Sequence, residues 1–266
     1  MKPLAAHWPA GASAGLRGVF TDIDDTLTTG GAITPDALQA LADLQAAGLA
    51  VVAVTGRSVG WSLPFAAAWP VDAIVAENGA VALLRRAGGG GVEKRYQQDA
   101  ATRAAHFARM QEVLALIERS IPGARRAGDS GGRETDIAVD HSEFAQLSEA
   151  QIDKVVLAMR HEGLHATVSS IHVNGWFGGH DKLQGARWIV RELWQRDLDA
   201  ELDRWAYVGD STNDARMFGA FALSVGVANI ARFVPHLSQL PRYVTAAERG
   251  AGFAEFACLV LAQRRP

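Results

Sequence analysis

The sequence predicts an α/β protein whose parallel sheet is interrupted by an α+β insert. Apolar, strand-like runs alternate with helical segments at both ends of the 266-residue chain, and this alternation is lost in the middle. Alternating strands and helices form βαβ units and a parallel sheet, whereas strands and helices in mixed order indicate an α+β unit. Hydrophobic residues make up 48% of the chain, which is enough for a sizeable core.

The first third of the chain carries the alternating pattern. LAVVAV at 49–54 is a continuous apolar run, typical of a parallel strand that is covered on both faces. Thr34 and Pro35 provide the N-cap and the first residue of a helix, which Gly48 ends. The expected elements are strands over 18–23, 49–54 and 72–76, a helix between Thr34 and Gly48, and a helix that ends near Trp69.

The pattern breaks at the glycines of 88–91, which indicate a flexible loop or the tip of a hairpin. Beyond them we expect a helix over 99–120, a strand over 135–139, a helix over 148–162 and two short strands flanking 169–170. Alternation then returns with a helix over 181–195, strands over 205–208 and 222–225, and a helix over 248–263. The predicted domains are a core of residues 1–84 and 181–266 and an insert of residues 85–180.

Composition limits the partners of the chain. The formal net charge is only −3 and the basic residues are scattered, so we expect no nucleic-acid partner. No run approaches the roughly 20 apolar residues that cross a membrane. The single cysteine, Cys258, fits a reducing compartment, and the segment before Gly18 is expected to be a loose tail rather than a signal peptide. We therefore expect a cytoplasmic protein with a small-molecule partner, its oligomeric state left open.

Polar residues gather directly after the predicted strands. The clusters are Asp22, Asp24 and Asp25 after the first strand, Thr55-Gly56-Arg57 after the second, and Asp210 to Asp214 after a late one. Ligands of open α/β sheets bind at the carboxyl ends of the strands, so these clusters are expected to share one edge. Each cluster alone could be a turn or a helix cap, but their order behind successive strands favours a functional site.

The acids of these clusters need cations nearby. Asp22 and Asp24 face the same way on an extended segment, and two carboxylates about 4 Å apart repel by about 4 kcal/mol at an effective dielectric constant of about 20. Lys182 is one candidate cation. Mg²⁺ is the other, because oxygen ligands without nearby His or Cys favour it over zinc. Mg²⁺ often joins carboxylates to a substrate phosphate, so the sequence predicts a phosphate site.

These residues resemble a known family. DIDDT at 22–26, TGR at 55–57, Lys182 and GDSTND at 209–214 are similar, in order, to the four motifs of the haloacid dehalogenase-like superfamily of phosphohydrolases. The resemblance implies a Rossmann-like parallel-sheet core. The insert is similar in position to the cap of the subfamily that includes Cof-type, sucrose-phosphate, trehalose-phosphate and mannosyl-phosphoglycerate phosphatases and phosphomannomutase, and it is expected to open and close over the site.

The resemblance implies a role for each motif residue. Asp22 would be the nucleophile, Asp24 the general acid and base, and Lys182 the cation that neutralises the reacting groups. Dehalogenases typically lack the second aspartate, so Asp24 favours phosphoryl transfer. The implied phosphate-binding residues are Thr55, Gly56 and Arg57, and the implied Mg²⁺ ligands are Asp22, the Asp24 carbonyl and Asp210, supported by Asn213 or Asp214. Many relatives have Gly at the position of Asp25, for which we favour a turn over a substrate contact.

Residues outside the four motifs are weaker candidates for substrate binding. Asn78 could lie near the site or form a type I′ turn with Gly79, and Arg133 could bind a second anionic group. His180 lies next to Lys182 in the sequence. Other polar or aromatic residues that could contact a sugar are Glu134, Asp136, His172, Asn174 and Trp176, although we favour surface strands for the polar residues and core packing for the tryptophan.

The implied function is a Mg²⁺-dependent phosphatase of a small phosphorylated metabolite, a sugar phosphate, acting through an aspartyl-phosphate. Two alternatives stay open. A phosphomutase of the phosphomannomutase type shares the four motifs but returns the phosphoryl group to the sugar. A protein that only senses a phosphorylated ligand is the other, and the intact Asp24 speaks against it.

Overall fold

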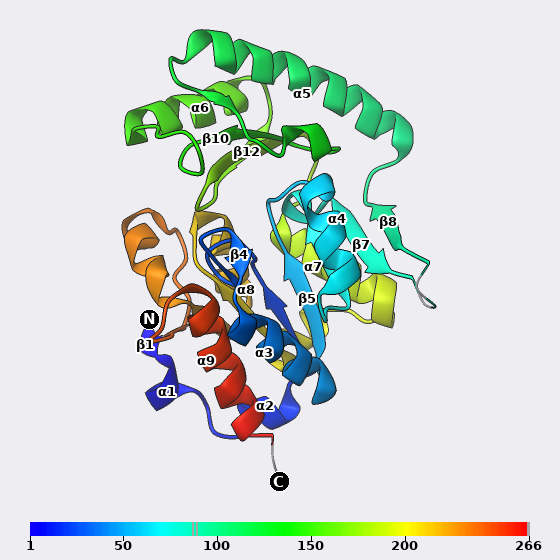
Figure 1. Ribbon diagram of the computed structural model, residues 1–266, viewed down its shortest axis with the longest axis vertical. Coiled ribbons are helices and arrows are strands. Elements are labelled where there is room, and N and C mark those ends of the chain that lie inside the picture. Colours follow the sequence, from blue (N-terminus) through cyan, green and yellow to red (C-terminus); the bar gives the residue numbers. More distant parts are fainter. Residues whose placement is uncertain (87, 89, 265–266) are drawn as a thin grey trace.

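The computed structural model describes residues 1–86, 88 and 90–264. Its lower part in Figure 1 is built on a nine-stranded sheet of order β1-β15-β14-β13-β2-β5-β6-β7-β8. The strands from β1 to β6 in this order run parallel, and β7 and β8 are antiparallel to their neighbours. Their bounds are β1 Lys2–Pro3, β2 Gly18–Thr21, β5 Ala50–Val54, β6 Ala73–Ala76, β7 Val81–Arg85, β8 Val92–Tyr96, β13 Trp205–Gly209, β14 Leu223–Gly226 and β15 Tyr243–Val244.

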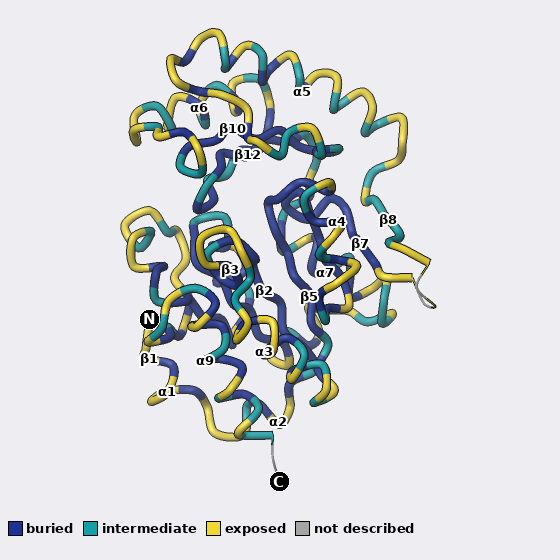
Figure 2. The backbone as a smooth tube through the Cα atoms, viewed as in Figure 1, coloured by how far each residue is buried: buried dark blue, intermediate teal, exposed yellow. Residues whose placement is uncertain are grey.

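Helices cover both faces of this sheet. One face packs against α3 (Pro35–Ala46), α4 (Val59–Ala68) and α9 (Arg249–Ala262), and the other against α7 (Lys182–Trp194) and α8 (Ala215–Ala220). Neighbouring strand residues therefore enter different cores: Val51 lies in the first and Val52 in the second. Figure 2 shows the central strands buried along their length. The predicted parallel-sheet α/β class is confirmed, and the double cover explains why the second strand is continuously apolar.

The upper part of Figure 1 is a second, α+β unit. An antiparallel sheet of order β11-β12-β10-β9 carries two helices, α5 and α6, on the side away from the large sheet. Their apolar faces and the strands share a separate hydrophobic core, which includes Met110, Val155 and Val173. The bounds are α5 Ala100–Ser120, β9 Arg125–Arg126, β10 Ile137–Asp140, α6 Glu149–His161, β11 His165–Val168 and β12 His172–Trp176.

The predicted boundary of the insert at residue 85 needs a different position. β8 pairs with β7 from Val92 to Arg85 and so extends the large sheet. The glycine-rich segment is the connection of this hairpin, although residues 87 and 89 lie outside the described ones. We propose that the core comprises residues 1–96 and 181–266 and that the insert comprises residues 97–180.

The prediction of a loose N-terminal tail is wrong. β1 pairs with β15, and the short helices α1 (Leu4–His7) and α2 (Ala12–Gly15) follow it. Leu4 and Trp8 are buried, and the Trp8 ring meets Tyr243 and Phe256 edge-on at centroid distances of 5.3 and 5.7 Å. The segment is ordered by apolar partners more than 230 residues away in the sequence, which local patterns do not show.

The remaining elements are short. They are the hairpin strands β3 (Thr28–Thr29) and β4 (Ala32–Ile33), and the 3-10 helices η1 (Glu77–Gly79), η3 (Ser130–Gly132), η4 (Asp199–Arg204), η5 (Thr212–Asp214) and η6 (Ala228–His236). No helix within the described part of the chain combines the length and the apolar character that crossing a membrane requires.

Close packing of α7 on η1 gives a first prediction. A Cβ added to Gly185 would lie 2.6 Å from the Gly79 Cα, so backbone would have to move. Gly185→Ala is expected to lower the free energy of unfolding by about 1–3 kcal/mol, as overpacking does. In Gly15→Ala the new methyl group would meet no described atom within 4 Å, which makes it the control. Thermal unfolding checks both, and equal midpoints for the two variants would contradict the packing argument.

Candidate active site

The predicted polar clusters meet at one edge of the large sheet. β13, β2, β5 and β6 are neighbours and run parallel, so their carboxyl ends lie side by side. The chain leaves these strands at Asp210, Asp22, Thr55 and Glu77. The second unit lies over this edge in Figure 1.

Lys182 is the centre of this edge. It begins α7, and its buried Nζ lies 2.8 Å from Asp22 Oδ1 and 2.7 Å from Asp214 Oδ1. Burial alone would lower the pKa of Lys182, but Asp214 and Asp22 outweigh it and raise that pKa above its usual value. The ammonium group therefore stays charged and fixes two of the acids.

Each carboxylate oxygen of Asp214 accepts two hydrogen bonds from the protein. Its Oδ2 accepts hydrogen bonds from the amides of Asp210, at 2.9 Å, and Ser211, at 3.1 Å. Its Oδ1 accepts from Lys182 and from the Tyr207 hydroxyl. Asp214 thus holds the loop after β13 and the lysine in place, which fits the supporting role that the sequence analysis allowed it.

The acids at this edge fit a bound cation. Oxygens of Asp22, Asp210 and Asp214 lie within 4.8 Å of one another. Asp210 Oδ2 accepts from Asn229 at 3.0 Å, while its Oδ1 is buried without a hydrogen-bond partner among the residues that the structure describes. Burial and the neighbouring acids raise the pKa of Asp210 well above its usual value, and burial, partly offset by Lys182, raises the pKa of Asp22 to about 7. One lysine does not balance three buried carboxylates, and an all-oxygen donor set suits Mg²⁺.

The loop after β5 offers hydroxyl and backbone groups. The Thr55 hydroxyl accepts from the Arg57 amide at 3.0 Å, which leaves its own O–H free to donate to a ligand. A Cβ on Gly56 would lie 3.2 Å from Asn78 Oδ1 and 3.3 Å from Asn174 Oδ1, so a larger residue would crowd this point.

Arg57 is occupied by protein carboxylates. Its Nε lies 3.0 and 2.9 Å from the two oxygens of Asp24, and its Nη2 lies 2.9 Å from Asp24 Oδ1 and 2.8 Å from Glu143 Oε1. Burial lowers the pKa of Arg57, but Asp24 and Glu143 outweigh it and raise the pKa above its usual value. The structure thus shows Arg57 linking the second aspartate of DIDDT to a residue of the insert.

Arg133 does not have the arrangement expected of a grip for a second anion. Its Nε and Nη2 bind Asp129, its Nη1 binds Asp136 at 2.7 Å and the Gly56 carbonyl at 3.1 Å, and its Nη2 also lies 3.4 Å from His172 Nδ1. All of its donor nitrogens are used within the protein. In this structure Arg133 joins the insert to the loop after β5 through the Gly56 carbonyl.

Asn78 and His180 lie in different surroundings. Asn78 has a φ of 55° within η1, not in a two-residue hairpin, and its Nδ2 donates to Asp136 Oδ2 at 3.2 Å beside Gly56.

His180 stacks on Trp176 with ring centroids 5.6 Å apart, and the Trp176 indole donates to the His180 carbonyl. Both aromatic residues are buried, so Trp176 has no open face for a sugar. His180 has no contact with Asp22 or Lys182 among the hydrogen bonds of the described residues.

The other polar candidates have protein partners. Asn213 accepts from the Ser211 hydroxyl at 2.9 Å. Glu134 binds Lys94 and Tyr96, His172 binds Glu143, and Asn174 Nδ2 donates to the Gly56 carbonyl.

Asp25 occupies a turn. Its φ of 54° lies in the left-handed region, where glycine is favoured. Its carboxylate pairs with Arg232 at 2.8 Å and Arg249 at 3.1 Å. The turn interpretation agrees with this geometry.

Four residues near this edge were absent from the candidates. Glu143 reaches Arg57 from the insert, and Asn229 and Arg232 reach Asp210 from η6. Glu77 accepts from the amides of Val59, Glu134 and Thr135 and so ties the two units together. Asn229 and Glu77 follow strands, so the strand-end rule could have found them, whereas nothing local marks Glu143.

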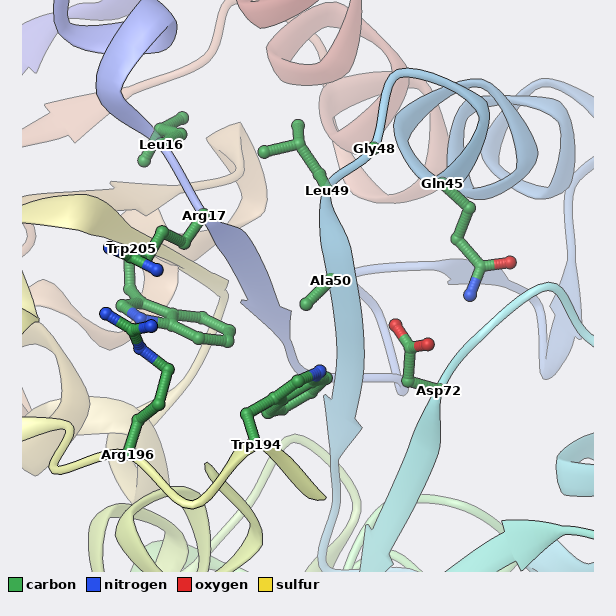
Figure 3. Close-up of a pocket in the computed structure, with 10 residues that line it drawn as sticks. All are labelled: Leu16, Arg17, Gln45, Gly48, Leu49, Ala50, Asp72, Trp194, Arg196 and Trp205. Atoms are coloured by element: carbon green, nitrogen blue, oxygen red, sulfur yellow. The ribbon is translucent and has the colours of Figure 1, made fainter. Parts of the chain in front are cut away.

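A cavity elsewhere is unrelated to this edge. It has a volume of about 740 Å³ and contains Arg17, Arg196, Trp194 and Trp205 (Figure 3). Its residues precede or begin β2, β5 and β13, so it lies at the amino ends of the strands. Ligand chemistry of this fold belongs to the carboxyl ends.

Comparison with known proteins agrees with the motifs. The family model for haloacid dehalogenase-like hydrolases matches residues 19–119. No curated protein matches the chain in sequence. The family match covers the first part of the core and the start of the insert, and it agrees with the resemblance of the four motifs.

Solved structures share the whole fold at low identity. A protein of Thermoplasma acidophilum is 16% identical with a TM-score of 0.71, covering 92% of this chain and 98% of its own. The sucrose-phosphatase of Synechocystis sp. PCC6803, solved with sucrose and phosphate, is 15% identical with a TM-score of 0.65 over the same shares. A trehalose-6-phosphate phosphatase related protein is 16% identical with a TM-score of 0.61, covering 93% and 99%.

The buried His180 gives a second prediction. Burial lowers its pKa to about 4 from the usual 6.5, so between these values the unfolded chain binds a proton that the folded chain does not. Stability from this group is present above pH 6.5 and falls as the pH drops toward 4, by up to about 3 kcal/mol. In His180→Phe the unfolding midpoint should depend less on pH over this range. His161→Phe, at an exposed site, should keep the wild-type pH dependence. Parallel pH profiles for wild type and His180→Phe would contradict this.

Proposed function

We propose that the protein is a Mg²⁺-dependent phosphatase that hydrolyses a small phosphorylated metabolite, a sugar phosphate, through an aspartyl-phosphate on Asp22. The observation that carries the proposal is the buried Lys182, which bridges Asp22 and Asp214 beside the unpartnered oxygen of Asp210. Lys182 partly offsets the burial that raises the pKa of Asp22, and the remaining acids attract a cation, which in turn attracts a phosphate. The solved sucrose-phosphatase and the trehalose-6-phosphate phosphatase related protein, which share the fold, support the substrate class.

In the first step, an Asp22 oxygen attacks phosphorus and forms the O–P bond while the bond from phosphorus to the leaving oxygen breaks. Lys182, 2.8 Å from Asp22, stabilises the negative charge of the transferring group. Asp24, in its acid form, gives its proton to the leaving alkoxide and becomes a carboxylate. The products of this step are the free alcohol and the aspartyl-phosphate.

In the second step, water attacks phosphorus and the bond to Asp22 breaks. The Asp24 carboxylate takes a proton from that water, which restores both aspartates and releases inorganic phosphate. The Thr55 hydroxyl and the Gly56 amide would hold the phosphate oxygens, and the insert lies over the site and limits access of water. Arg57 would hold Asp24 and Glu143 through its two ion pairs and would not bind the phosphate.

Mg²⁺ would be held by Asp22, Asp210 and the Asp24 carbonyl, with Asp214 and Asn213 shaping the loop. When bound, the ion neutralises the acids and polarises the phosphoryl oxygens. Asn229 and Arg232 orient Asp210 from the outer side.

Loss of the nucleophile gives a third prediction. Asp22→Asn keeps the size of the side chain but removes its nucleophilic oxygen, so phosphate release should fall at least about a thousandfold. Asp203→Asn, at an exposed site, is the control and should keep wild-type activity. The measurement is inorganic phosphate released from hexose phosphates. Unchanged release by Asp22→Asn would refute the catalytic assignment, and isomerisation without release would favour a phosphomutase.

The cation site gives a fourth prediction that does not depend on turnover. Mg²⁺ at about 100 times its dissociation constant should stabilise the wild type by about 2.7 kcal/mol, which thermal unfolding detects. Asp210→Asn should abolish this shift, because it removes the buried charge that the ion balances. Without Mg²⁺ the variant should be at least as stable as wild type, because the unpartnered carboxylate is gone. Asp203→Asn should keep the shift, and a shift that survives in Asp210→Asn would rule out this ligand.

A further inference from the structure

A second cavity opens directly beside the proposed acid and base. It has a volume of about 340 Å³ and lies between the β3–β4 hairpin of the core and two loops of the insert. Its lining residues are Asp24, Asp25, Thr28, Gly30, Gly31, Arg57, Glu143, Phe144 and Ile171. The leaving oxygen must approach Asp24 to receive a proton, so the group attached to that oxygen extends into this cavity.

The cavity contains an excess of hydrogen-bond acceptors. Arg57 is the one cationic side chain among its described lining residues, and it is shared by Asp24 and Glu143. Asp25 is paired with Arg232 and Arg249, which are not among the lining residues. Asp24 and Glu143 therefore share one guanidinium, and Glu143 keeps lone pairs for hydroxyl donors.

Glu143 remains ionised in this setting. Burial opposes the charge, but hydrogen bonds from His172 and Arg57 outweigh it and lower the pKa of Glu143 to about 2. An anionic group entering the cavity would meet this charge at short range with no free cation among the described lining residues to offset it.

The loop that carries Glu143 is built rigidly. The Asp140 carboxylate accepts hydrogen bonds from four successive amides, those of residues 142–145, at 2.9 to 3.1 Å. The Ser142 hydroxyl donates to the Ser170 carbonyl at 2.8 Å and ties the two insert loops together. On this loop the Phe144 side chain is 80% exposed, which is unusual for a phenylalanine held so firmly.

Resting on the proposed phosphatase function, we propose that this cavity binds the leaving group and that Glu143 and Phe144 select a neutral, hydroxyl-bearing one over an anionic one. The Glu143 carboxylate accepts hydrogen bonds from hydroxyl groups, and the Phe144 ring covers the C–H face of the carbon chain or ring. Glycines 30 and 31, with φ values of 61° and 81°, keep the opposite wall free of side chains. Glu143 is thus a specificity-determining residue and not a catalytic one.

Two esters of the same length test the proposal. Glycerol 3-phosphate and 3-phosphoglycerate differ at the far end, which is a hydroxymethyl group in one and a carboxylate in the other. For wild type, kcat/KM should be at least about tenfold higher for glycerol 3-phosphate, whose leaving group is neutral. The charge of Glu143 repels the carboxylate of 3-phosphoglycerate. Glu143→Gln should reduce this ratio about threefold to tenfold, whatever its effect on the absolute rates. Glu112→Gln makes the same change of net charge on an exposed part of the insert and should leave the ratio unchanged.

A second variant and a reference substrate separate the outcomes. Acetyl phosphate, whose leaving group needs no proton, reports phosphatase activity independently of the acid role of Asp24. Phe144→Ala should raise KM for glucose 6-phosphate several-fold more than it raises KM for acetyl phosphate, whose leaving group is smaller. If wild type hydrolyses acetyl phosphate but prefers the anionic ester, or if Glu143→Gln keeps the ratio, the inference is overturned while the proposed function stands.

A variant at Arg160 tests whether the leaving group binds in a different cavity. It lines another cavity, of about 470 Å³, between α6 and η6. A change of the ester ratio in Arg160→Gln but not in Glu143→Gln would place the leaving group there and would also overturn the inference. If wild type releases phosphate from none of these compounds, the proposed function fails, and the inference fails with it.

Discussion

The buried ammonium group of Lys182, held between Asp22 and Asp214, is the contact on which the geometry of the sheet edge depends. It joins the start of α7 to the ends of two neighbouring strands. Removing one partner of a buried ion pair typically costs about 3–5 kcal/mol, because the other charge is left unbalanced. Here the balance is incomplete even with the lysine, since Asp210 adds a further buried carboxylate. The folded protein therefore carries a negative excess that a cation can relieve, and a cation in turn attracts a phosphate.

The insert meets this edge through charged and polar groups. Glu77, at a φ of 50°, accepts hydrogen bonds from backbone amides of both units. Arg133 donates a hydrogen bond from the insert to the Gly56 carbonyl. Arg57 completes the contact with Glu143. Interfaces between domains that are polar in this way allow relative motion more readily than large apolar ones. The same hydrogen bonds that seat the insert thus lie next to the groups proposed to react, so motion of the insert and access to the site are linked.

Much of the fold could be predicted from local pattern. The helix that starts at Pro35 and the strand that ends at Val54 lie within a residue or two of their expected bounds, because capping and continuous apolar runs are local signals. The N-terminal segment and the β8 strand could not be predicted in this way. Leu4 and Trp8 show no period of their own, and they are ordered by Tyr243 and Phe256 from the far end of the chain. β8 is half-exposed and mixed in composition, so pairing with β7 decides its conformation.

For the site, the sequence by itself determined which residues end the parallel strands, and the topology rule then brings Asp22, Thr55 and Asp210 to one edge. Tertiary structure alone decided which partners those residues have. Arg133 offers the same guanidinium in any context, but its burial against Asp129 and Asp136 uses the donors that a substrate would need. Glu143 lies 86 residues from Arg57, and only the seating of the insert brings them together. Side-chain type is a local property, whereas burial and pairing depend on the whole folded chain.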